Sequence, residues 1–234
     1  NEVLPKAQTD DSDRSQPQSS GMNAKERPAG LYRVKPEAQR VLGPIVSALV
    51  ARGVSADAVT LAAIPVAAVG GLCLALSDAW PALLLAVPFL AALRLILNLI
   101  DGQVARRTGT AHAMGEVLNE LGDRISDVLF IGGLAFVPIV GPALGLAAVI
   151  AALLASYAGI TASAVGAGRQ YGGLMSKPGR MITLAVAAPL AFILGDTWPL
   201  LAAAWIIIVG GLLTLVQRLQ ATRHALDRDE ADSP

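Results

Sequence analysis

Six apolar runs dominate the sequence, and short polar or Gly/Pro-containing breaks separate them. The runs cover residues 57–77, 80–105, 113–138, 141–166, 180–195 and 197–217. A helix needs roughly 20 mostly apolar residues to cross a bilayer. The pattern therefore predicts an all-α fold: a polytopic integral membrane protein whose six transmembrane helices form one domain over residues 54–220.

Two segments of different character precede the first run. Residues 1–30 are rich in Ser, Gln, Pro and Asp and hold almost no large apolar side chains, which predicts a disordered tail. The first Met is at position 22, so part of this tail could derive from cloning. Residues 31–53 place apolar residues at helical spacing among charged ones, which predicts an amphipathic helix in the membrane interface. A solvated linker helix is the alternative.

Composition and charge support a membrane protein and exclude one class of partner. Hydrophobic residues make up 54% of the chain and charged residues only 15%, whereas soluble domains contain about 25% charged residues. The formal net charge of zero gives no basic surface for nucleic acid. Lys and Arg residues gather at both termini and in the connections after the second and fourth runs. By the positive-inside rule, those connections, both termini and the 221–234 tail are expected to be cytoplasmic.

Polar side chains inside two of the runs are the strongest functional signal. The second run ends with Arg94, Asn98 and Asp101 on one helical face. The third begins with a face that carries Glu116, Asn119, Glu120, Asp123 and Asp127. Charges within a bilayer are costly unless they face a partner or a cavity, so such residues are candidates for function.

Carboxylates packed this closely repel one another unless cations offset their charge. Oxygen ligands from Asp, Glu and Asn, with no His or Cys at ligand spacing, suit Mg²⁺ or Mn²⁺ better than zinc, as one or two ions. The alternative is a network of buried salt bridges with the nearby arginines, which are Arg94, Arg106, Arg107 and Arg124.

Other residues of the same segment point to an anionic ligand. Gly102 and Gly115 lack side chains that would keep a ligand away from the helix backbone. Arg106 and Arg107 are placed to form charge-assisted hydrogen bonds with a phosphate or diphosphate. The residues alone therefore predict a metal-dependent site for an anionic ligand.

The motif resembles the signature of the CDP-alcohol phosphotransferase family, which reads D-x-x-D-G-x-x-A-R-x8-G-x-x-x-D-x-x-x-D. This chain has Asp101-Gly-x-x-Ala-Arg106, eight residues, and then Gly115-x-x-x-Asn119-x-x-x-Asp123. The resemblance extends to the segment from Ser55 to Thr60 and to Lys177-Pro-Gly-Arg180.

The resemblance implies a phosphatidyltransferase of phospholipid biosynthesis in the bacterial inner or plasma membrane. Such an enzyme takes a phosphatidyl group from CDP-diacylglycerol, transfers it to an alcohol acceptor, which can be a polyol phosphate, and releases CMP. The reaction is expected at the cytoplasmic leaflet, among membrane lipids. A homodimer is also implied, because family members are commonly dimers.

The resemblance also implies roles for particular residues. The metal ligands would be Asn98, Asp101, Asn119 and Asp123, with Glu116, Glu120 and Asp127 as further candidates. The CDP site would be lined by Gly102, Ala105, Arg106 and Gly115. Asp123 would be the base that takes the acceptor's proton. The acceptor would meet Arg94, Lys177 and Arg180, with Arg169 as another basic candidate.

Two departures from the signature leave an alternative open. Asn98 and Asn119 stand where the family pattern has Asp, so the site loses two negative charges and should bind divalent ions less tightly. A catalytically silent relative that binds CDP-lipid or nucleotide as a scaffold is the competing hypothesis. A transporter with buried carboxylates is disfavoured, because it would not need glycines at the signature spacing.

Overall fold

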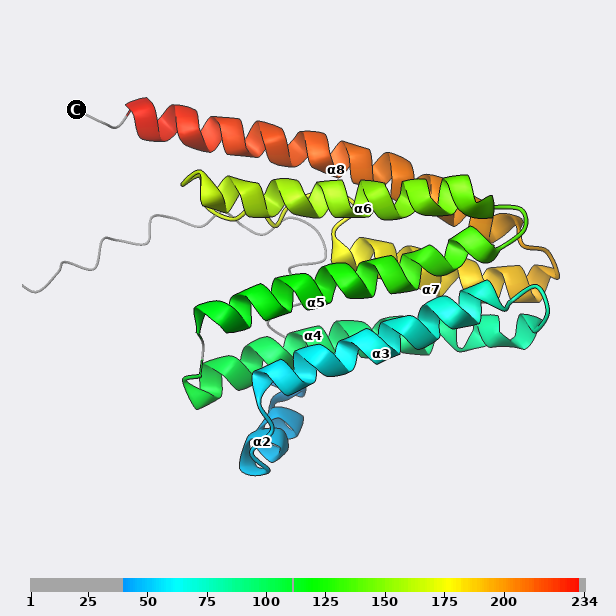
Figure 1. Cartoon of the computed structure of the whole chain (residues 1–234), viewed down its shortest axis with the longest axis horizontal. Coiled ribbons are helices and arrows are strands. Elements are labelled where there is room, and N and C mark those ends of the chain that lie inside the picture. The colour runs from blue at the N-terminus through cyan, green and yellow to red at the C-terminus, as the bar shows by residue number, and fades with distance from the viewer. Residues whose placement is uncertain (1–39, 111, 232–234) are drawn as a thin grey trace, which may run out of the picture.

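The computed structural model describes residues 40–110 and 112–231 (Figure 1). Within this part of the chain the regular elements are helices, and no strand is present. The predicted disordered tail and the first part of the predicted amphipathic segment lie outside the described residues, as do the last three residues of the chain.

A helix forms at each of the six apolar runs. They are α3 (Ala56–Ala75), α4 (Val87–Thr108), α5 (Ala113–Gly132), α6 (Gly141–Ala164), α7 (Lys177–Leu194) and α8 (Trp198–Ala231). Two short 3-10 helices, η2 (Pro81–Leu85) and η3 (Gly133–Phe136), lie before α4 and after α5. A shorter helix, α2 (Gly43–Ala51), precedes α3 within the segment predicted to be amphipathic.

The exterior of the helices has the character of a lipid-facing surface. Five of the helical segments are long and apolar enough to cross a membrane: α3, η2 with α4, α6, α7 and α8. Large apolar side chains such as Phe89, Phe136 and Ile193 are more than 70% exposed, far above what a soluble surface tolerates over many helices. The chain is thus an all-α polytopic membrane protein, as predicted. Helix α5 is also long enough to span, but it carries five charged residues, so the count of six spans stays a prediction.

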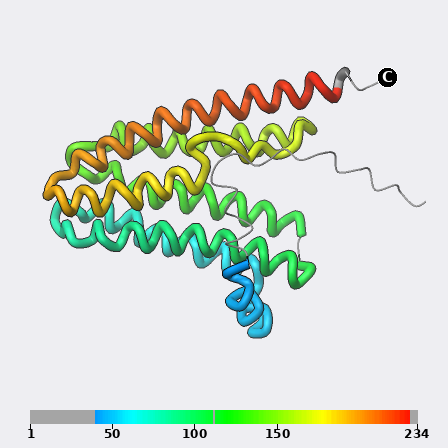
Figure 2. The backbone as a smooth tube through the Cα atoms, turned by 180° about the vertical axis from the view of Figure 1, so that it is seen from behind, coloured from blue at the N-terminus to red at the C-terminus, as the bar shows by residue number. Residues whose placement is uncertain are grey.

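The helices lie side by side, and their connections alternate between two ends of the bundle (Figure 1). One end holds α2, the α4–α5 connection, the α6–α7 connection and the end of α8. The opposite end holds the α3–α4, α5–α6 and α7–α8 connections, and the view from behind agrees (Figure 2). The basic connections thus share one end of the molecule, as the positive-inside argument requires.

A close crossing of α3 and α5 fixes the position of the polar face of α5. A Cβ atom added to Gly71 would lie 1.9 Å from the carbonyl oxygen of Leu129, so only glycine permits this approach. Gly133 makes the reciprocal contact, because its Cβ would lie 2.2 Å from the carbonyl oxygen of Gly71. The crossing holds α5 directly against α3, and α4 packs on the same helix.

Candidate active site

The two halves of the signature face each other because a short connection joins α4 to α5. Gly109 ends α4 in the left-handed conformation, with a φ of 65°. The side chain of His112 then caps α5, where its Nδ1 accepts a hydrogen bond of 2.8 Å from the backbone N–H of Gly115. Asp101 and Asp123 are therefore carried by consecutive antiparallel helices, which both pack on α3, at the same end of the bundle.

Asp101 is buried and held by two hydrogen bonds. The Thr60 hydroxyl on α3 donates to Oδ2 over 3.1 Å, and the backbone N–H of Gly102 donates to Oδ1. Only 5% of the residue is exposed. Sequence reasoning did not single out Thr60 as a site residue, because one threonine in an apolar helix gives no signal without its partner.

Asp123 lies where three helices converge. The side-chain amide of Asn98 on α4 donates to Oδ1 over 3.2 Å, and the ammonium group of Lys177 at the start of α7 forms an ion pair with Oδ2. The guanidinium of Arg94 donates to the backbone carbonyl of Asp123 over 3.1 Å. These partners lie up to 54 positions from Asp123 in the sequence. The structure thus brings candidate residues from separate helices into direct contact.

Asp127 is fully buried and paired with two arginines. Arg94 donates to its Oδ1 at 2.8 Å and Arg180 to its Oδ2 at 2.7 Å. Both arginine side chains are 2% exposed. Asp127 therefore belongs to a buried salt-bridge network, which was the alternative to a metal site. Its second partner is Arg180, whereas the sequence had suggested Arg106 or Arg107. Because both arginines are enclosed and paired, they connect α4, α5 and α7 in this structure. Their expected contact with an acceptor stays a prediction.

Glu120 is also occupied by basic side chains. Its Oε2 accepts from Arg124 at 3.1 Å, and its Oε1 pairs with Arg169 from the α6–α7 connection. Burial alone would lower the pKa of Arg169, but the hydrogen bond and the charge of Glu120 outweigh it and raise that pKa above its ordinary value. Glu116, by contrast, is exposed at the start of α5.

At the two glycines expected to line the CDP site, polar side chains approach the helix backbone closely. A Cβ on Gly102 would lie 3.3 Å from a guanidinium nitrogen of Arg106, and one on Gly115 would lie 3.4 Å from the Asp57 carboxylate. Ala105 completes the small-residue surface on α4 and is half-buried. Arg106 is exposed, and within the described part of the chain it has no ion pair.

A pocket of about 230 Å³ lies beside these residues. Its wall is mixed, with Ser55, Asp57, Thr108 and His112 beside apolar residues such as Val50 and Val54. A larger pocket of about 320 Å³ lies between α7 and α8 and is lined almost wholly by apolar residues, including Ile182, Trp198 and Ile206. The smaller pocket is nearer to the signature, because Asp57 and His112, which line it, also lie next to Gly115.

The oxygen atoms at the site fit a hard divalent cation. The Oδ1 atom of Asn119 is buried and has no hydrogen-bond partner, so it is an oxygen available as a ligand. With the carboxylates of Asp101 and Asp123 it gives an all-oxygen donor set suited to Mg²⁺ or Mn²⁺. Among the described residues no three His, Cys, Asp or Glu side chains form a metal-binding group, because two of the four signature positions are amides.

Known proteins with similar sequences identify the family. The chain is 33% identical over 152 residues to the inner membrane protein YnbA of Escherichia coli K12, an alignment that covers 65% of this chain and 75% of that protein. It is 30% identical over 192 residues to the phosphatidylinositol phosphate synthase of Mycobacteroides abscessus, covering 79% of this chain and 84% of that enzyme. The chain belongs to the CDP-alcohol phosphotransferase family. No family model matches it.

Solved structures support the same family. The phosphatidylinositol phosphate synthase PgsA1 of Mycobacterium tuberculosis with CDP-DAG bound superposes with a TM-score of 0.65 at 28% identity, over 78% of this chain and 94% of that one. The same enzyme in complex with manganese and citrate gives a TM-score of 0.63 at 27% identity, over 76% and 87% of the two chains. The predicted family and the predicted class of metal ion are thus confirmed at the level of relatives.

Proposed function

We propose that this CDP-alcohol phosphotransferase moves a phosphatidyl group from CDP-diacylglycerol to the hydroxyl group of an alcohol, with release of CMP. The observation that carries the proposal is the position of Asp123. Its carboxylate lies at the junction of α4, α5 and α7, within 3.2 Å of Asn98 and paired with Lys177. It lies on the same helix as Gly115, a residue of the signature's nucleotide site.

The chemistry needs one proton acceptor. The acceptor's hydroxyl oxygen forms a bond to the phosphorus of the phosphatidyl group, the bond from that phosphorus to the oxygen of CMP breaks, and the hydroxyl proton passes to the carboxylate of Asp123. Lys177 and Asn98 hold that carboxylate in place by contacts to its two oxygens. Thr60 and the Gly102 N–H orient Asp101 in the same way.

A bound Mg²⁺ or Mn²⁺ would neutralise the diphosphate of the donor. Asp101, Asp123 and the free Oδ1 atom of Asn119 would hold it, with Asn98 next to them. Arg106 would add a charge-assisted hydrogen bond to the diphosphate, because it is exposed beside Gly102. The pocket lined by Asp57 and His112 would receive the nucleotide end of the donor.

The orientation in the membrane follows from charge. The basic connections and the signature residues share one end of the bundle, and this is the end we assign to the cytoplasm of a bacterial cell. CDP-diacylglycerol would then enter from the inner leaflet. We assign the catalytic domain to residues 54–220, and we expect the protein to form a homodimer.

The two amides at the site favour one competing function. Without two of the four signature carboxylates the protein could bind CDP-lipid without transferring its phosphatidyl group. Release of CMP separates the two functions, because a silent binder does not break the diphosphate bond.

The test is an assay of CMP release by the purified protein with CDP-diacylglycerol and Mn²⁺ or Mg²⁺. Inositol, glycerol, serine and the phosphates of inositol and glycerol serve as acceptors. We expect metal-dependent CMP release that one acceptor stimulates. The double variant Asp101→Ala/Asp123→Ala should release none, and full activity in that variant would refute the proposal. Binding of CDP-lipid without CMP release by the wild type would instead support the scaffold.

A further inference from the structure

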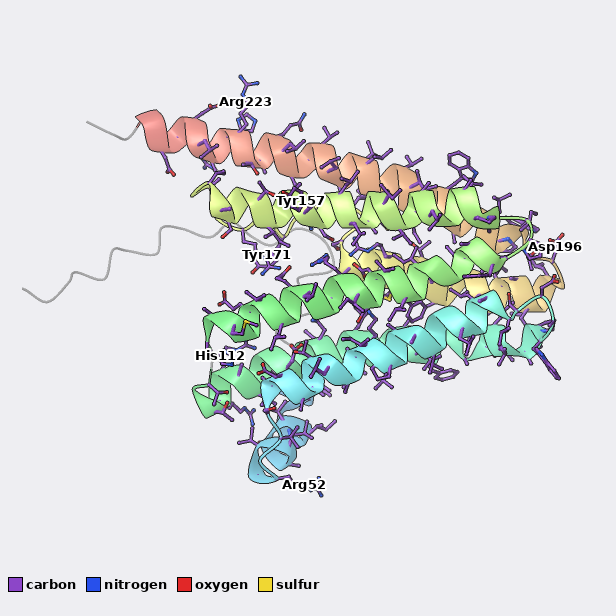
Figure 3. All side chains as sticks on the ribbon, viewed as in Figure 1. Arg52, His112, Tyr157, Tyr171, Asp196 and Arg223 are labelled. Carbon is purple, nitrogen blue, oxygen red and sulfur yellow. The ribbon has the colours of Figure 1, made fainter. Side chains whose placement is uncertain are left out.

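The carboxylate of Glu120 bridges two arginines one helical turn before Asp123. Its Oε2 accepts from Arg124 over 3.1 Å, and its Oε1 pairs with Arg169. The guanidinium of Arg169 also lies over the ring of Tyr171, 4.8 Å from the ring centre. Figure 3 shows Tyr171 towards the same end of the bundle as His112 and far from Asp196.

The three side chains are partly enclosed, so their pairing is more than a loose surface contact. Glu120 is 19% exposed, Arg124 22% and Arg169 33%. Arg124 is held in addition by Asp127, at 3.8 Å. Charge-assisted contacts of this kind gain strength where water is partly excluded.

The remaining basic side chains around Asp123 are paired as well. Arg94 and Arg180 are enclosed against Asp127, and Lys177 contacts Asp123 itself. Within residues 40–110 and 112–231, each of the five cations of this region therefore touches a carboxylate. Arg106 forms no ion pair within these residues. It lies next to Gly102, however, and so belongs to the site assigned to the CDP donor.

A phosphorylated acceptor would fit this arrangement poorly. Its phosphate would need cationic donors near Asp123, where its hydroxyl group must be placed. It would have to remove Arg124 and Arg169 from Glu120 and would then lie beside two carboxylates of like charge. An uncharged polyol requires only hydrogen bonds and avoids both costs.

We infer that the acceptor is an alcohol without a phosphate group, and that Glu120 determines this specificity by occupying Arg124 and Arg169 with its own carboxylate. The inference rests on the proposed function and specifies the class of its acceptor. Glu120 takes the place that an anionic group of the acceptor would occupy.

Matched acceptor pairs provide the test, since each pair differs only by one phosphate. The full chain in lipid nanodiscs, with CDP-diacylglycerol and Mn²⁺, is assayed for CMP release with inositol against inositol phosphate and with glycerol against glycerol phosphate. We expect kcat/KM for the uncharged member of the effective pair to be higher by about tenfold or more. A preference for the phosphorylated member, which the names of the relatives would suggest, overturns the inference.

Variants of Glu120 test its role separately. Glu120→Gln and Glu120→Ser should raise kcat/KM for the phosphorylated member by about tenfold and change that for the uncharged member less. Asp227→Asn is the matched control, because it also removes a carboxylate that is paired with an arginine, Arg223, on a helix that ends at the same side. It should leave the preference unchanged. Unchanged preference in both Glu120 variants, with activity retained, overturns the role of Glu120.

Calorimetry keeps this inference distinguishable from the proposed function. Titration of inositol phosphate into the CDP-bound protein should give heat of binding with Glu120→Gln and none with the wild type. If no acceptor supports CMP release, the proposed function is wrong. The titration alone then tests whether Glu120 excludes a phosphorylated ligand. Tighter binding of inositol phosphate by the wild type than by Glu120→Gln then overturns it.

Discussion

Arg180 donates a hydrogen bond of 2.7 Å to Asp127, and it does so between α7 and α5 with both side chains almost fully enclosed. The second oxygen of the same carboxylate accepts from Arg94 on α4. One buried carboxylate therefore joins three helices directly behind Asp123. The contact also aligns the start of α7, so it places Lys177 opposite Asp123.

Replacing Asp127 should strongly destabilise the protein. Asp127→Asn leaves Arg94 and Arg180 enclosed without a counter-charge, and loss of one partner from a buried ion pair costs about 3 kcal/mol or more. We expect a clear decrease of the melting temperature in detergent, followed by intrinsic tryptophan fluorescence. Asp227→Asn, which removes an exposed partner of Arg223, should shift it little. Equal shifts in the two variants would contradict the assigned role of Asp127.

Restoring carboxylates at the signature positions should tighten metal binding. Asn98→Asp/Asn119→Asp adds two negative charges beside Asp101 and Asp123, so the affinity for Mn²⁺ should rise by about tenfold or more. Without metal the variant should melt at a lower temperature, because Asn98 no longer donates to Asp123. Electron paramagnetic resonance of free Mn²⁺ measures the affinity. Gln220→Glu, an exposed change on α8, should not alter it, and an equal gain there would refute the explanation.

Thr60 should matter for activity through Asp101. Thr60→Val keeps the shape of the side chain but removes the hydroxyl group that donates to Oδ2 of Asp101. A hydrogen bond to a charged group is worth about 1.5–3 kcal/mol, so we expect CMP release to slow by about tenfold or more. Thr60→Ser should restore most of the rate, since it restores the donor. Thr222→Val removes a hydroxyl that bonds only to a backbone carbonyl on α8 and serves as the control.

The close crossing of α3 and α5 should not tolerate a side chain. Gly71→Ala would place a Cβ atom 1.9 Å from the Leu129 carbonyl oxygen, so the two backbones would have to separate. Overpacking of this kind costs about 2 kcal/mol, which a lowered melting temperature would reveal. Gly172→Ala adds the same methyl group where no other atom lies within 4 Å, and it should have a small effect. A normal melting temperature for Gly71→Ala would show that the helices can separate at little cost.

The sequence by itself determined the fold class and the family. Apolar runs of bilayer length leave few structures other than a bundle of membrane helices, because every backbone polar group must be satisfied within the span. The glycines, arginine and carboxylates at fixed spacing gave the signature, and similar proteins confirm the family that it indicated. These features are local in sequence, so periodicity and spacing are enough to find them.

Only the tertiary structure decided which polar groups meet. A helical wheel places Glu120, Asp123 and Asp127 on one face, but it says nothing about the helix that lies opposite each of them. In the structure, Asp127 pairs with Arg94 and Arg180, and Glu120 pairs with Arg124 and Arg169. Asp123 contacts Asn98 and Lys177. Apart from Arg124, which lies on α5 itself, the partners come from α4, α7 and the α6–α7 connection. How deeply each pair is buried depends on how closely the helices pack. For that reason three carboxylates that look equivalent in the sequence receive different roles in the folded protein.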